Sequence, residues 1–88
     1  MIKKEIKILN QLGLHARPAS MISKLCSQYS CNIKMIKDNY EVNPKSIMGI
    51  LTLAAQKDSI ITVITDGKDE KEAMEAIESL FKSNFDEE

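Results

Sequence analysis

The sequence contains a single histidine, and it stands where a glycine-containing bend leads into a predicted helix. Backbone amides in the first turn of a helix have no intrahelical acceptor, so His15 would lie beside a ready anion-binding position. The positive end of the helix disfavours imidazolium, which favours a neutral, nucleophilic ring near neutral pH. Arg17 follows two residues later and can place a guanidinium beside a phosphate.

A nucleophile, a positive clamp and unpaired amides suit phosphoryl transfer, which depends chiefly on positioning and charge stabilisation. No Asp or Glu lies close to His15 in the sequence, and none is needed if the neutral imidazole attacks directly. From the residues alone, a structural interpretation stays open. A histidine at a helix start is often a cap or a surface residue, and most arginines, Arg17 included, are solvated or paired.

Ser46 is the second residue that can carry chemistry. It precedes an apolar run and suits the N-cap of a short helix over residues 47–53. The alternative interpretation is a phosphorylation switch, because a phosphate there adds nearly two negative charges. If Ile47, Met48 and Leu51 form an exposed apolar patch, that charge would change which proteins dock; the same side chains also suit a core.

The elements that must position these residues follow from the apolar periodicity. It predicts strands that include residues 2–8, 33–35, 40–42 and 59–64, and helices beginning at His15, Ser46 and about Asp69. Asp38 and Asn39 suit a tight hairpin, and Phe85 begins a short acidic tail. The side chains expected to face inward from the first and last helices are Ala19, Ile22, Leu25, Cys26, Tyr29, Ala73, Ile77, Leu80 and Phe81.

This order of short strands and helices predicts an α+β fold with an antiparallel or mixed sheet and helices on one side. The 88 residues suffice for one domain, spanning residues 1–88. No secretory signal or membrane span is recognised, so we expect a soluble, cytoplasmic protein. Cys26 and Cys31 are expected to be reduced thiols with Cys26 inert in the core, and the chain has too few ligands for a metal site.

The net charge of −1 hides an asymmetry. Residues 1–57 carry nine basic and three acidic side chains, whereas residues 58–88 carry three basic and ten acidic ones. Nucleic-acid binding is not favoured, because the lysines are scattered, arginine occurs once and no aromatic residues are interleaved with them. Solvated faces, or a positive surface that steers an acidic protein partner, account for the pattern.

Two segments of the sequence are informative together: Gly13-Leu14-His15-Ala16-Arg17-Pro18-Ala19 and Lys45-Ser46-Ile47-Met48-Gly49. With this spacing they resemble the HPr family, the histidine-containing phosphocarrier proteins of the bacterial phosphoenolpyruvate-dependent phosphotransferase system. The resemblance covers essentially the whole chain. It implies an open-faced β-sandwich, in which a four-stranded antiparallel sheet carries three helices on one face.

The resemblance implies that enzyme I phosphorylates His15 on Nδ1 and that the group then passes to a IIA domain of a sugar permease. Arg17 would stabilise the phosphoryl group, and Ser46 matches the site used by HPr kinase/phosphorylase in bacteria that have it. The chain would be a monomeric carrier, without a cofactor, and not an enzyme in the strict sense. The implied docking surface comprises Ala16, Ser20, Lys24, Lys45, Ile47, Met48 and Leu51.

Some positions depart from the common family pattern. Leu12 stands where many members have a small polar residue, so support for the His15 loop comes from Asn10 or Gln11, or is absent. Pro44 would stiffen the approach to Ser46. The predicted turns at residues 38–39 and 57–58 lack the glycine common there.

Two alternative functions remain. The lead-in to His15 and the final stretch also resemble the nitrogen-related branch, NPr, in which the same chemistry has a regulatory output; the segment around Ser46 favours the sugar-type carrier. The second alternative is a regulatory interaction module acting through Ser46 alone. The presence of both His15 and Arg17 argues against it.

Overall fold

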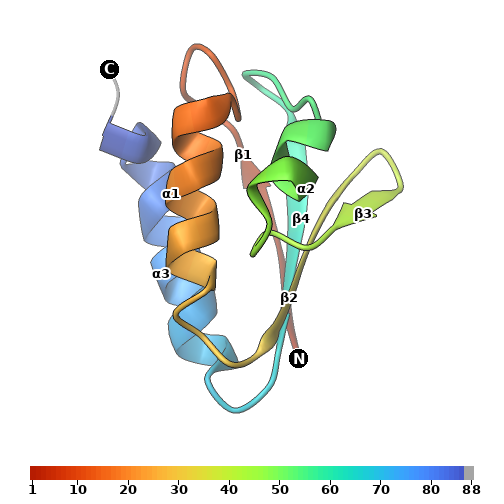
Figure 1. The fold of residues 1–88 in the computed structure, drawn as a ribbon, viewed down its shortest axis with the longest axis vertical. Coiled ribbons are helices and arrows are strands. Elements are labelled where there is room, and N and C mark those ends of the chain that lie inside the picture. Colours follow the sequence, from red (N-terminus) through yellow and green to blue (C-terminus); the bar gives the residue numbers. More distant parts are fainter. Residues whose placement is uncertain (87–88) are drawn as a thin grey trace.

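The computed structural model describes residues 1–86. The four strands in these residues form one sheet in the order β1-β4-β2-β3. The strands are β1 (Ile2–Lys7), β2 (Asn32–Lys37), β3 (Tyr40–Val42) and β4 (Ile60–Asp66). Every neighbouring pair is antiparallel. The helices α1 (Ala16–Cys26), α2 (Ile47–Thr52) and α3 (Glu70–Lys82) cover one face of this sheet (Figure 1). The predicted α+β open-faced sandwich is confirmed.

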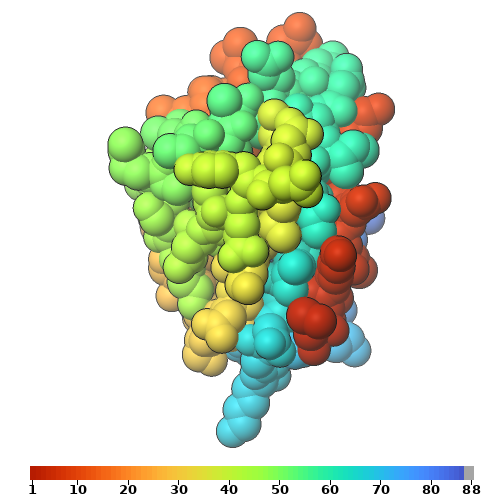
Figure 2. All heavy atoms as spheres, turned by 90° about the vertical axis from the view of Figure 1, so that its right-hand side faces the viewer, coloured from red at the N-terminus to blue at the C-terminus, as the bar shows by residue number. Residues whose placement is uncertain are grey.

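The two faces of the sheet differ because side chains alternate along each strand. In β4, Ile61, Val63 and Thr65 are buried beneath the helices, whereas Ile60 and Asp66 are exposed on the other side. Antiparallel sheets tolerate one wet face. Figure 2 shows this open face, with β1 in red beside β4 in teal.

The turns form without glycine at two predicted places. Asp38 and Asn39 have φ of 52° and 68° and join the paired residues Lys37 and Tyr40. Positive φ at both central positions matches the right-handed twist of a hairpin, and Asp and Asn tolerate it best after glycine. Asp58 likewise has φ of 72°.

The helices present their predicted apolar stripes to the core. Ala19, Ile22 and Cys26 of α1 are buried, and the expected inward residues of α3 are either buried or packed against the core. No helix within residues 1–86 is both long and apolar enough to cross a membrane. Burial raises the pKa of the Cys26 thiol to about 12 and that of Cys31 to about 11. Both cysteines are free thiols, as predicted.

Asp69 joins the start of α3 to the loop between α1 and β2. Its carboxylate accepts hydrogen bonds from the amides of Ser30 and Cys31 at 2.8 and 2.9 Å. The bond from the Ser30 amide is the largest of the effects that lower the pKa of Asp69. This contact anchors the end of the molecule opposite the His15 loop (Figure 1).

The structure corrects the expected tail at Phe85. Residues 84–86 form a left-handed turn with φ of 54°, 55° and 58°. This turn buries the Phe85 ring, which meets Phe81 edge to face with 5.0 Å between centroids. Phe85 is therefore part of the core, because its apolar ring outweighs the acidic character of its neighbours. The remaining tail residues, Glu87 and Glu88, lie outside the described residues.

Candidate functional site

His15 is the N-cap residue of α1. Its backbone is extended, with φ −79° and ψ −169°, and its carbonyl accepts the first helical hydrogen bond from the Ala19 amide at 3.0 Å. Its side chain makes no capping hydrogen bond and is half-buried. The helix therefore begins through the backbone of His15, and the imidazole is not needed as a cap.

The first turn of α1 presents positive charge next to this ring. The amides of Ala16 and Arg17 lie in the first turn, where the helix offers them no acceptor, and Pro18 has no amide hydrogen. Ala16 and Arg17 are exposed, so the guanidinium of Arg17 reaches solvent at the same helix end. A half-buried imidazole, an exposed guanidinium and first-turn amides are thus brought to one terminus. This arrangement can accept and neutralise a phosphoryl group.

The bend before His15 requires glycine. Gly13 has φ of 66°, and a Cβ atom there would lie 2.4 Å from the Ala55 carbonyl oxygen and 2.8 Å from Cα of Gln56. The next amide, that of Leu14, donates to the same Ala55 oxygen at 2.9 Å. The loop bearing His15 is therefore packed directly against the segment that follows α2, which lies beside it at one end of the molecule (Figure 1).

Asn10 provides the support for this loop that the sequence left open. Its Nδ2 donates to the Gly13 carbonyl at 2.8 Å, and its own carbonyl accepts from the Gly13 amide at 3.2 Å. Gln11 makes a different contact, accepting from Lys57 Nζ at 3.2 Å on the exposed surface. Leu12 is 71% exposed at the tip. Asn10, whose residue exposure is 1%, therefore acts from inside the loop.

Ser46 caps α2, as predicted. Its Oγ accepts a hydrogen bond from the Gly49 amide at 3.2 Å, and the Ser46 residue itself is exposed. Its backbone amide donates to the Asn43 carbonyl at 3.1 Å. Pro44, between these residues, is buried. The serine hydroxyl is accessible from solvent while it holds the first turn of the helix.

The apolar residues of α2 divide between the core and the surface. Ile50 is fully buried, whereas Ile47 and Met48 are 42% and 70% exposed and Leu51 is half-buried. The sequence did not decide between these locations. Ile47 and Met48 thus give α2 an outward-facing apolar patch next to the Ser46 cap.

The two helix ends belong to one connected surface. The helices α1 and α2 lie side by side (Figure 1), and Ser23 Oγ of α1 donates to the Lys45 carbonyl at 2.8 Å. Three expected docking residues of α1 are exposed: Ala16, Ser20 and Lys24. Lys45 differs from them, because its ammonium donates to the carbonyls of Tyr29 and Cys31 at 2.8 and 3.0 Å. Its charge is held at the loop after α1, and its role in docking stays a prediction.

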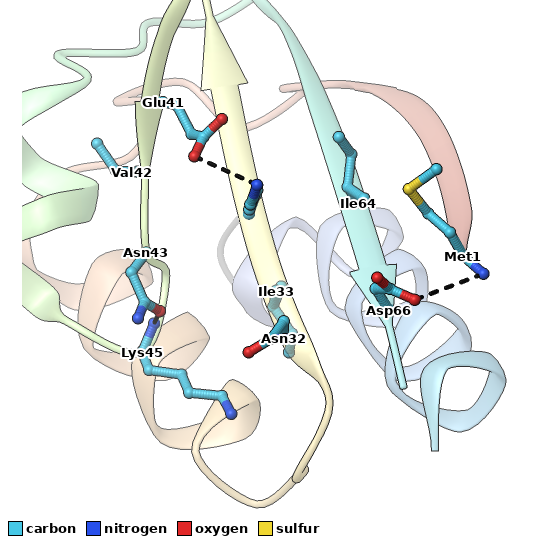
Figure 3. Close-up of a pocket in the computed structure, with 10 residues that line it drawn as sticks. Met1, Asn32, Ile33, Glu41, Val42, Asn43, Lys45, Ile64 and Asp66 are labelled. Carbon is cyan, nitrogen blue, oxygen red and sulfur yellow. Dashed lines mark hydrogen bonds and ion pairs between the residues drawn. The ribbon is translucent and has the colours of Figure 1, made fainter. Parts of the chain in front are cut away.

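A separate hollow lies on the open face of the sheet (Figure 3). It measures about 430 Å³ and is lined mainly by β2, β3, the end of β4 and the segment 43–45. Two of its lining residues, Lys34 and Glu41, form an ion pair at 3.6 Å, and both are exposed. His15 and Ser46 do not line it. The hollow therefore contributes nothing to the site at the start of α1.

Known proteins match the chain along its length. The family described as "PTS HPr component phosphorylation site" matches residues 2–83. Phosphocarrier protein HPr of Treponema pallidum is 41% identical over 88 residues, covering 100% of both chains. The crystal structure of HPr-C-His from Thermoanaerobacter tengcongensis is 42% identical, covers 100% of this chain and 99% of that one, and superimposes with a TM-score of 0.96.

The chain is also similar to a protein described as HPr-like. The HPr-like protein Crh of Halalkalibacterium halodurans is 43% identical over 77 residues, which cover 88% of this chain and 92% of that protein. The sequence match, the shared fold and the histidine at the start of α1 agree with one another. The chain belongs to the HPr family, the non-catalytic phosphocarrier proteins of the phosphotransferase system.

Proposed function

We propose that this chain accepts a phosphoryl group from phospho-enzyme I on His15 and passes it to a histidine on IIA domains of sugar permeases. The observation that supports this most is the placement of His15: its backbone starts α1 while its side chain leaves the cap unmade, next to exposed Arg17. The proposed setting is the cytoplasm, where the chain meets both partners as a monomer.

In the proposed transfer, a nitrogen–phosphorus bond of the donor breaks as a new bond forms to Nδ1 of His15. The lone pair of the neutral ring supplies the new bond, so no separate base is required. The Arg17 guanidinium and the first-turn amides of α1 oppose the charge spread over the phosphoryl oxygens. The reverse geometry serves delivery to the acceptor histidine.

Docking would use the surface made by α1 and α2. Exposed Met48 and Ile47 supply apolar contact, and Arg17 and Lys24 supply positive charge for an acidic partner. A carrier must release each partner quickly, so we expect a small interface and a short-lived complex.

Ser46 is the proposed point of regulation. Its exposed hydroxyl lies next to the apolar patch of α2, so a phosphate there would put charge where a partner makes apolar contact. An HPr kinase/phosphorylase is the proposed modifying enzyme. The cap need not be lost, because a phosphate oxygen can accept from first-turn amides as the hydroxyl does.

Two regulatory functions are the alternatives. One is a phosphocarrier of the nitrogen-related branch, in which the acceptor is a regulatory IIA protein. The other is a module that acts through Ser46 without phosphorylation of His15. His15 and Arg17, present together at an open helix end, favour the carrier.

The test is incubation of the purified chain with enzyme I and phosphoenolpyruvate, followed by intact mass and acid treatment, with His15→Ala as the control. The expected result is a gain of one phosphoryl group that is acid-labile, base-stable and absent from the variant. If enzyme I phosphorylates another HPr in the same assay but leaves this chain unchanged, the proposed donor is wrong. The Ser46 module then becomes the better interpretation.

A further inference from the structure

We propose that Asn10 is a positioning residue for phosphoryl transfer at His15. This inference rests on the proposed carrier function and adds a residue that never touches the phosphoryl group. Asn10 acts by fixing Gly13, and through it the backbone that carries the imidazole into position.

Asn10 forms hydrogen bonds with both the amide and the carbonyl of Gly13. The Asn10 carbonyl accepts from the Gly13 amide at 3.2 Å, while its side-chain Nδ2 donates to the Gly13 carbonyl at 2.8 Å. The asparagine is 1% exposed, so water does not compete readily for this side-chain bond. One buried residue therefore sets the orientation of the bend two residues before His15.

The segment after α2 also confines Gly13. Its α-carbon lies so close to Ala55 that no Cβ fits, and the Leu14 amide donates to the Ala55 carbonyl at 2.9 Å. Asn10 on one side and Ala55 on the other leave the bend little freedom to shift. His15 is then held between this bend and the first hydrogen-bonded turn of α1.

This rigidity matters for transfer because the ring nitrogen must align with the donor phosphorus. A misplacement of about 1 Å can cost a reaction roughly a hundredfold in rate. Docking depends instead on the exposed surface of α1 and α2, to which buried Asn10 does not contribute. The two effects can therefore be separated as the rate at saturating donor and the KM for the donor.

The experiment compares Asn10→Ala and Asn10→Asp with wild type and with Asn43→Ala. Asn10→Asp keeps the size of the side chain and removes the amide donor. Asn43 makes a similar side-chain-to-backbone bond, from the Lys45 amide to its Oδ1 at 2.9 Å, in the loop before α2. Phosphorylation of His15 by phospho-enzyme I is followed over a range of donor concentrations, and rates are corrected for the folded fraction from denaturant titrations.

Both Asn10 variants are expected to lose about tenfold in rate at saturating donor while KM stays within about twofold. Amide exchange measured by NMR is expected to rise at Gly13 and Leu14 and not in the central strands. Asn43→Ala is expected to keep the wild-type rate. These measurements do not depend on each other, since exchange needs no donor.

The proposal is overturned if folded Asn10→Ala transfers at the wild-type rate, or if KM rises while the saturated rate is unchanged. It also fails if exchange rises across the whole sheet and the rate loss equals the unfolded fraction, since Asn10 would then be a general stability residue. If wild type itself is not phosphorylated while another HPr is, the carrier function fails. The exchange result then still reports whether Asn10 holds the bend.

Discussion

The starts of α1 and α2 solve the same structural problem in opposite ways. At α2, the Ser46 side chain makes the cap by accepting from the Gly49 amide at 3.2 Å. At α1, the His15 side chain makes no capping bond. Support comes instead from the preceding loop, through Asn10 and the Ala55 carbonyl.

The two helix starts therefore differ in how much their stability depends on the first side chain. A helix that depends on its N-cap side chain loses stability when that side chain is altered, typically by about 1 kcal/mol. A helix that begins through backbone contacts allows its first side chain to be modified and restored repeatedly. Under the proposed function, phosphorylation of His15 removes no cap bond, whereas Ser46 makes a cap bond that Asp or a phosphate can also make.

The substitution His15→Ala should have the largest effect. Phosphoryl acceptance should fall below detection, a loss of more than about a thousandfold, because the nucleophile is removed. The variant should stay folded, since the start of α1 is held by backbone contacts and not by a capping bond of the ring. Intact mass and urea denaturation measure the two quantities. A marked loss of stability would show that the imidazole supports the loop and would erase the contrast between the helix ends.

Arg17→Ala should slow transfer in both directions by roughly a hundredfold, as loss of one strong electrostatic contact to a transition state does. The fold should persist, because Arg17 is exposed. Rapid-quench rates with phospho-enzyme I and with a IIA acceptor test this. Lys24→Ala, which removes an exposed charge on the same helix, is the matched control and should affect transfer less. If the two substitutions slow transfer equally, Arg17 has no specific role in stabilising the phosphoryl group.

Ser46→Asp should raise the KM for phospho-enzyme I roughly tenfold, equivalent to about 1.4 kcal/mol of docking free energy. The negative charge would stand beside Ile47 and Met48 on the docking surface. Asp is itself a good N-cap residue, so stability should be retained. Steady-state kinetics give the answer, and kinetics matching wild type would argue that Ser46 is only a cap.

Ser46→Ala should have the smallest effect, and on stability alone. Loss of the bond to the Gly49 amide should lower the free energy of unfolding by about 1 kcal/mol while phosphoryl acceptance stays close to normal. Denaturant titration and the acceptance assay measure this pair. Unchanged stability together with slower acceptance would reverse the comparison between the two helix ends.

The helices and strands were predictable because their signals are local. The alternation in β2 and β4 and the helical spacing in α1 and α3 each lie within a few residues of sequence. The roles of His15 and Arg17 were predicted from the family resemblance and stay predictions. The exposed face of α2 needed the structure, because Ile47 and Ile50 are alike in type and differ only in which side of a short helix meets the core.

The residues that escaped prediction depend on distant partners. Asn10 and Gln11 both carry side-chain amides, and only the structure shows that Asn10 is buried inside the loop while Gln11 is exposed. The docking role expected of Lys45 stays a prediction, and only the structure shows that its ammonium donates to carbonyls after α1. Phe85 offered one local clue, its position four residues after Phe81, but a left-handed turn of consecutive non-glycine residues has no simple sequence signal.

In the sheet, β1 pairs with β4, and Ile2 lies opposite Thr65. The first strand therefore cannot pair until the last strand has been synthesised. The His15 loop has the same dependence, because the Leu14 amide needs the Ala55 carbonyl and the Ile8 amide needs the Ser59 carbonyl. During synthesis, a nascent chain that ends before these residues leave the ribosome cannot give His15 its final setting. Under the proposed function, His15 would therefore become an efficient phosphoryl acceptor only once the chain has been extended past Ser59 and this part of the sheet has formed.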